Sequence, residues 1–104
     1  MASLFIIRLN YSRGMEQARK LGDLADRLKE EVDRHLEDTI ADLNENWNGE
    51  NAQADLMKCR KLQDNIRKNV NQLRKASETV RTLVQNTYNA EMNSYRIAQK
   101  RTYH

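Results

Sequence analysis

The chain of 104 residues contains no proline, and its only glycines are at positions 14, 22 and 49. Because proline breaks helices and β-folds need many turn residues, such a chain is suited to long, continuous α-helices. Apolar residues form 38% of the sequence and charged residues 32%, which is too lean for a core of several layers. We therefore predict an all-α fold in a single domain.

Apolar residues recur every three or four positions in the first half, which is the spacing of one helix face. We predict a first helix over about residues 11–46, capped by Asn10 or Ser12, after an N-terminal tail at 1–10. The predicted core positions of this helix are Leu21, Leu24, Leu28, Val32, Leu36, Ile40 and Leu43.

The same spacing resumes after the midpoint, with Cys59 on the stripe and Ser77 as its one polar member. We predict a second helix over about residues 50–98, followed by a tail at 99–104. The predicted core positions of this helix are Leu56, Leu62, Ile66, Val70, Leu73, Val80 and Val84.

The two stripes are separated by residues 43–52, LNENWNGENA, which hold the only tryptophan of the chain. Asparagine favours helix ends, and Gly49 can adopt the left-handed conformation that ends a helix. We predict a turn made by Trp47, Asn48 and Gly49, with the indole covering the bend over Ala52. A loop this short makes the helices antiparallel, as in an αα-hairpin.

Two helices with one apolar stripe each make a thin core, and long stripes usually bury more against a third and a fourth helix. We predict a dimer that forms a four-helix bundle, with a second copy or with a related chain. Residues 11–46 carry a net charge of −4 and residues 50–104 carry +6. This asymmetry either attracts the two helices to each other or reflects two solvated faces.

The second predicted helix is longer than the first by about a dozen residues, so its end overhangs. Tyr88, Met92 and Tyr95 continue the apolar spacing along this overhang. Three outcomes are open for it: residues 4–7 fold back over it, a partner covers it, or it is a frayed tail.

The length, the two amphipathic helices and the central Trp47-Asn48-Gly49 resemble the WXG family of type VII secretion proteins, which includes the small early secreted antigen-like factors of Gram-positive bacteria and mycobacteria. The resemblance covers the whole chain in architecture, although the motif fixes only two residues. It implies a helical hairpin, dimerisation into a four-helix bundle and virulence-associated export by an ATPase-driven machine. Such a protein is made in the cytoplasm and secreted without a cleavable signal peptide.

The resemblance also implies the class of partner. This is a second copy, a related WXG-type chain, the helical N-terminal domain of a larger toxin, or the secretion ATPase. Many exported members carry a tyrosine followed four residues later by an acid. Here Tyr88 is followed by Glu91 after three residues, and Tyr95 by Gln99 after four. The candidate contacts with a partner or the export machine are Tyr88, Glu91, Met92 and Tyr95, whose alternative role is packing along the stripe.

Catalytic chemistry is hard to support from the sequence, and we expect no enzyme activity, no cofactor and no metal. His35 is the only internal histidine, and Cys59 lies on an apolar stripe without an identifiable base. No segment suits a membrane span. The rival function is nucleic-acid binding in the cytoplasm through the basic face of the second helix, although the acidic first helix beside it disfavours this.

Overall fold

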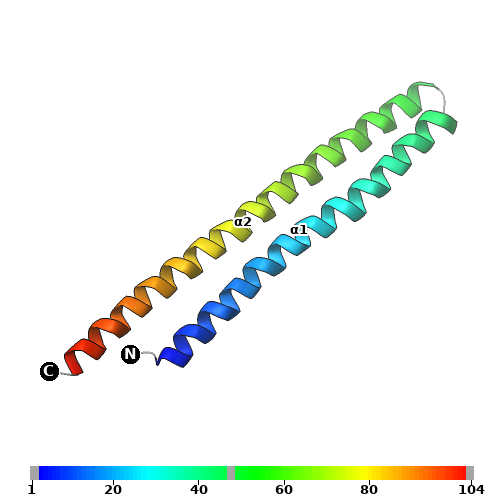
Figure 1. The fold of residues 1–104 in the computed structure, drawn as a ribbon. Helices are drawn as coiled ribbons and strands as arrows, with labels where there is room; N and C mark the ends of the chain where they lie inside the picture. Colours follow the sequence, from blue (N-terminus) through cyan, green and yellow to red (C-terminus); the bar gives the residue numbers. More distant parts are fainter. Residues whose placement is uncertain (1–2, 47–48, 103–104) are drawn as a thin grey trace. The chain divides into compact units, whose positions relative to one another are not determined.

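The computed structural model describes residues 3–46 and 49–102. Over these ranges the chain forms two α-helices and no β-strand (Figure 1). Helix α1 spans Leu4–Asn46 with 43 residues, and helix α2 spans Glu50–Thr102 with 53 residues. The predicted all-α fold of two helices is confirmed, and it is consistent with a helical hairpin.

Helix α1 begins earlier than the sequence analysis predicted. The prediction of a tail over residues 1–10 is wrong for residues 4–10, which are helical. Ser3 provides the N-cap in place of Asn10 or Ser12, because its Oγ accepts a hydrogen bond from the backbone N–H of Ile6 at 3.2 Å. At the other end of the chain, α2 continues to Thr102 rather than ending near residue 98.

The turn between the helices contains a residue with positive φ. Gly49 has a φ of 118°, in the region that favours glycine, as predicted for a left-handed position. Its carbonyl oxygen accepts the backbone N–H of Gln53 at 3.2 Å, so Gly49 also opens α2. The predicted roles of Trp47 and Asn48 lie outside the described residues.

The chain divides into two compact units, which are described separately. Unit 1 comprises residues 1–21 and 75–104, and unit 2 comprises residues 22–74. In unit 2, Arg74 pairs with Asp26, while Arg60 pairs with Glu37 further along α1. The partners on α2 descend as those on α1 ascend, so the two helical segments of unit 2 are antiparallel.

The helical segments of unit 1 are antiparallel by the same criterion. The Tyr11 hydroxyl donates to Gln85 Oε1 at 3.2 Å, and the Ser77 hydroxyl donates to the backbone oxygen of Ala18 at 2.7 Å. Ser77 was predicted to be the one polar member of its stripe. Ser77 is buried, and this bond to a helix carbonyl gives its hydroxyl group a hydrogen-bond partner.

Unit 1 also contains a close approach between the helices at Gly14. A Cβ placed on this glycine would lie 2.5 Å and 3.0 Å from the two methyl carbons of Val84. Real Cβ atoms do not approach carbon this closely, so the side chain of Val84 occupies the space that glycine leaves open.

Of the fourteen predicted core positions, two are buried, ten are half-buried and two are exposed. Ile40 and Val70 are buried, whereas Leu24 and Leu62 are 48% and 50% exposed. The other ten predicted core residues are half-buried: Leu21, Leu28, Val32, Leu36, Leu43, Leu56, Ile66, Leu73, Val80 and Val84.

The two errors have the same form. The prediction selected the larger apolar residue, but the buried position is the next one along each helix, Ala25 on α1 and Gln63 on α2. Ala25 permits a close helix contact. Gln63 can be buried because its side-chain amide donates hydrogen bonds to carboxylates on α1, as described below.

Candidate protein-binding surface

The four residues predicted to contact a partner, Tyr88, Glu91, Met92 and Tyr95, are all half-buried on α2. Tyr88 does not overhang α1, because its ring stacks on Tyr11 with centroids 4.5 Å apart and an interplanar angle of 43°. The prediction of an overhang at Tyr88 is therefore wrong, for the reason that α1 begins at Leu4. Stripe packing, the alternative role considered for Tyr88, is confirmed.

The hydroxyl groups of Tyr11 and Tyr95 take part in hydrogen bonds. The Gln85 side chain, which accepts from Tyr11, donates in turn to Asn89 Oδ1 at 3.1 Å. The Tyr95 hydroxyl accepts a bond from Gln99 Nε2 at 2.8 Å. These bonds fix the orientation of Tyr11 and Tyr95 on the two helices.

A groove in unit 1 runs between the first turns of α1 and the late turns of α2. We call it the terminal groove; its volume is about 170 Å³. Tyr88 and Glu91 were among the predicted contacts, and Val84 was a predicted core position. Ile7 belongs to the segment 4–7 that was one of the candidates to cover this part of α2, whereas Tyr11 was missed, although its spacing to Gly14 and Ala18 is helical. The groove is lined by Ile7, Asn10, Tyr11, Leu83, Val84, Thr87, Tyr88 and Glu91.

Glu91 is unusual among the acidic residues of unit 1, which number three against nine basic residues. Glu16 pairs with Arg19, whose hydrogen bond lowers the pKa of the Glu16 carboxyl. Glu78 pairs with Arg81 at 3.9 Å. Within the residues that the structure describes, Glu91 forms no ion pair, so the terminal groove carries an unneutralised carboxylate in a basic unit.

Unit 2 has the opposite charge balance, with nine basic and twelve acidic residues. Three arginines seven residues apart on α2 reach carboxylates on α1, at 3.7 Å for Arg60–Glu37, 3.9 Å for Arg67–Asp33 and 3.2 Å for Arg74–Asp26. The attraction between an acidic first helix and a basic second helix is present here as three interhelical ion pairs.

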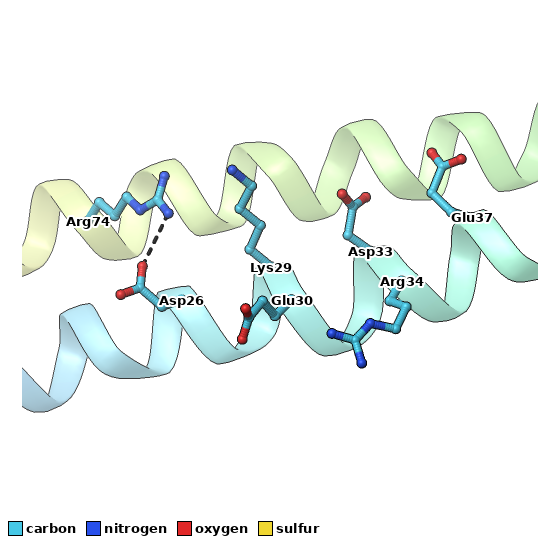
Figure 2. Close-up of a pocket in the computed structure, with 7 residues that line it drawn as sticks. All are labelled: Asp26, Lys29, Glu30, Asp33, Arg34, Glu37 and Arg74. Atoms are coloured by element: carbon cyan, nitrogen blue, oxygen red, sulfur yellow. Dashed lines mark hydrogen bonds and ion pairs between the residues drawn. The ribbon is translucent and has the colours of Figure 1, made fainter.

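The buried Gln63 lies within this row of charges. Its Nε2 donates to Asp33 Oδ1 at 2.8 Å and also to Glu37 Oε1. Figure 2 shows Asp33 and Glu37 directed toward α2, while Arg34 points away from it. The Gln63 amide thus shares these two carboxylates with Arg60 and Arg67, whereas Arg74 pairs with Asp26.

A charged surface hollow of about 650 Å³ lies along this row, lined by Asp26, Lys29, Glu30, Asp33, Arg34, Glu37 and Arg74 (Figure 2). Among the described residues, no three side chains of histidine, cysteine, aspartate or glutamate are grouped so that they could hold a metal ion. The hollow is an open, mixed-charge surface in which Arg74 is already paired to Asp26.

Several large apolar side chains are exposed on the described helices. Unit 2 exposes Leu24, Met57 and Leu62, while unit 1 exposes Phe5, Ile6, Leu83 and Ile97. Over the same described ranges, no helical stretch is long and apolar enough to cross a bilayer. His35 is exposed, and Cys59 is half-buried with a free thiol.

No protein-family model matches this chain, and neither the curated proteins nor the solved structures contain a significant match to it. The resemblance to WXG proteins therefore rests on the sequence alone, on Trp47, Asn48 and Gly49 between two stripes of helical spacing.

Proposed function

We propose that this protein acts by binding, as a helical hairpin that associates with a second helical chain into a four-helix bundle. The observation that supports this most strongly is the incomplete burial of its apolar side chains. Of the six buried apolar residues among those described, three are alanines, whereas seven large apolar side chains are exposed. Burial of a leucine side chain contributes about 1.5–3 kcal/mol, so covering these residues would favour association.

From the resemblance to WXG proteins, we further propose that the protein is a substrate or an escort of a type VII secretion machine. Its partner is then a second copy, a related WXG-type chain or the helical N-terminal domain of a larger toxin. The Tyr88–Tyr95 segment of α2 is the candidate contact with a partner or with the export ATPase.

Sedimentation equilibrium of the purified full chain, with and without candidate helical partners encoded beside it, tests the binding proposal. We expect a complex at micromolar concentration, with itself or with one of these partners. A chain that remains monomeric in every mixture would contradict the binding function.

Export is tested separately in a strain with a type VII machine. We expect the chain to reach the medium in a strain with an active secretion ATPase and to remain in the cells when the ATPase is inactivated. Equal release from both strains would contradict the secretion proposal while leaving the binding proposal intact.

Nucleic-acid binding is the second candidate, and the observation that favours it is the charge of unit 1, with nine basic and three acidic residues. Against it, Arg60, Arg67 and Arg74 on α2 are already paired with carboxylates of α1. A gel shift with duplex DNA distinguishes the two functions. Binding that weakens steeply with salt would favour this candidate, because phosphate contacts release counterions.

A further inference from the structure

The terminal groove has the size and the chemistry of a site for one apolar side chain. Its volume of about 170 Å³ is close to that of a cavity of about 150 Å³ that admits benzene in another protein. Leu83 forms part of its wall and is 60% exposed, so the fold of the single chain removes little of this side chain from water. An aliphatic side chain that entered the groove would cover Leu83 and Val84 together.

The carboxylate of Glu91 makes the groove favour a ligand with a positively charged side chain. Glu91 is half-buried in its lining and forms no ion pair within the described part of the chain. A partially desolvated carboxylate interacts more strongly with an incoming cation than a fully solvated one does. The fitting ligand is therefore an apolar side chain with a basic side chain one helical turn away.

The chain itself offers such a pair in unit 2. Leu62 is exposed beside the buried Gln63, and Lys58 precedes it by four residues, so the two are neighbours on the surface of α2. Lys58 is exposed and forms no ion pair with any described residue. Both belong to the acidic unit, which the net charge of the basic unit attracts.

We propose that the terminal groove binds Leu62 of a second copy of this chain, and that Lys58 of that copy pairs with Glu91. The order of the groups fits an antiparallel contact between the two α2 helices. On the groove side, the apolar Leu83 comes before the acid Glu91; on the incoming helix, the basic Lys58 comes before the apolar Leu62. Leu24 is the alternative occupant, but the lysine four residues before it, Lys20, belongs to the basic unit. The inference rests on the binding function proposed above and specifies its partner.

Charge reversal across the contact is the decisive experiment. Sedimentation equilibrium of the full chain at low salt would compare the wild type with Glu91→Lys, Lys58→Glu and the double variant. We expect each single reversal to weaken dimerisation at least tenfold and the double variant to return within about threefold of the wild type. Lys68→Glu, which makes the same charge change at another exposed position of unit 2, is the matched control and should have little effect.

The apolar part of the contact is tested by filling the groove and by removing its ligand. Thr87→Trp should block the groove and Leu62→Ser should remove the anchor, each weakening the dimer tenfold or more, with Met57→Ser as the control. Circular dichroism would verify that each variant keeps its helices. A dimer weakened by Leu24→Ser but not by Leu62→Ser would overturn this contact, as would a double reversal that does not recover.

These outcomes separate this inference from the proposed function. A wild-type dimer that is insensitive to all groove variants overturns the contact and leaves binding intact. A wild-type chain that associates only with a different protein also overturns the contact. Only the absence of every helical complex overturns both.

Discussion

In unit 1 the helices approach each other through small side chains and hydrogen bonds between neutral groups, whereas in unit 2 carboxylates of α1 bind amide and arginine side chains of α2. Gly14 leaves room for Val84 in unit 1, and the Ser77 hydroxyl reaches the backbone of Ala18. In unit 2, Gln63 and the row of arginines bond carboxylates of α1. The two helices are thus held in unit 1 by steric fit together with hydrogen bonds between neutral groups, and in unit 2 by polar bonds to carboxylates.

These two kinds of contact fix the register in which one helix lies along the other. Apolar stripes alone tolerate a shift of one helix along the other, because each turn of a stripe resembles the next. A buried polar group that needs a particular partner penalises such a shift, as polar core residues do in coiled coils. Gln63 places a polar group of this kind in unit 2, and Gly14 places a steric one in unit 1.

The largest loss of stability is expected from a substitution in the early turns of α1 in unit 1. Ile7→Ala should lower the free energy of unfolding by about 2–5 kcal/mol, because a buried aliphatic side chain is removed and a cavity is left. Ile7 is 2% exposed, and Phe5, two residues away, is 70% exposed. Urea denaturation at one fixed protein concentration measures the change, with Phe5→Ala as the control at about 0.5 kcal/mol or less. Equal effects of the two substitutions would show that residues 4–10 do not pack in unit 1.

The next effect is expected from the polar core of unit 2. Gln63→Glu replaces two amide bonds to carboxylates by repulsion from the same carboxylates. We expect a loss of about 2–3 kcal/mol at pH 7, the scale of hydrogen bonds to charged groups. Gln53→Glu makes the same change at an exposed position of α2 and should be nearly neutral. A melting temperature that falls equally in both variants would show that the hydrogen bonds of Gln63 do not stabilise unit 2.

A smaller effect is expected at the close approach in unit 1. Gly14→Ala should gain about 1 kcal/mol of helix propensity and lose about 1–3 kcal/mol through overlap with Val84. The net result is a destabilisation of up to about 2 kcal/mol, measured by urea denaturation. The double variant Gly14→Ala/Val84→Ala should lose about 1 kcal/mol less stability than the sum of the losses of the two single variants. Strict additivity would mean that the two residues do not touch.

The sequence was sufficient to predict the two helices, because the absence of proline and the regular apolar spacing leave few other folds. It also predicted positive φ at Gly49, where neighbouring asparagines indicate a helix end. The start of α1 was misplaced because Asn10 and Ser12 are good caps in isolation. Ser3 is an equally good cap, and nothing between residues 4 and 10 stops a helix.

The core could be predicted only to within one residue at some turns. Hydrophobicity favours Leu24 over Ala25 and Leu62 over Gln63, but the distance between the helices decides which side chain fits. Apolar spacing does not encode that distance. The terminal groove was missed for the same reason, because it depends on residues 7–11 of α1 lying beside residues 83–91 of α2.

The smallest effect is expected from the arginine row of unit 2. Arg74→Gln removes the shortest interhelical ion pair, and because both side chains are largely exposed we expect a loss of about 0.2–1 kcal/mol at low salt. The loss should almost vanish at 1 M salt, where the Debye length is about 3 Å. Arg81→Gln in unit 1 removes only a pair within one turn of α2 and should cost about 0.2–0.5 kcal/mol. Urea midpoints at the two salt concentrations measure all four values. A cost for Arg74→Gln above about 2 kcal/mol that persists at 1 M salt would mean that the arginines, rather than Gln63, hold the helices of unit 2 together.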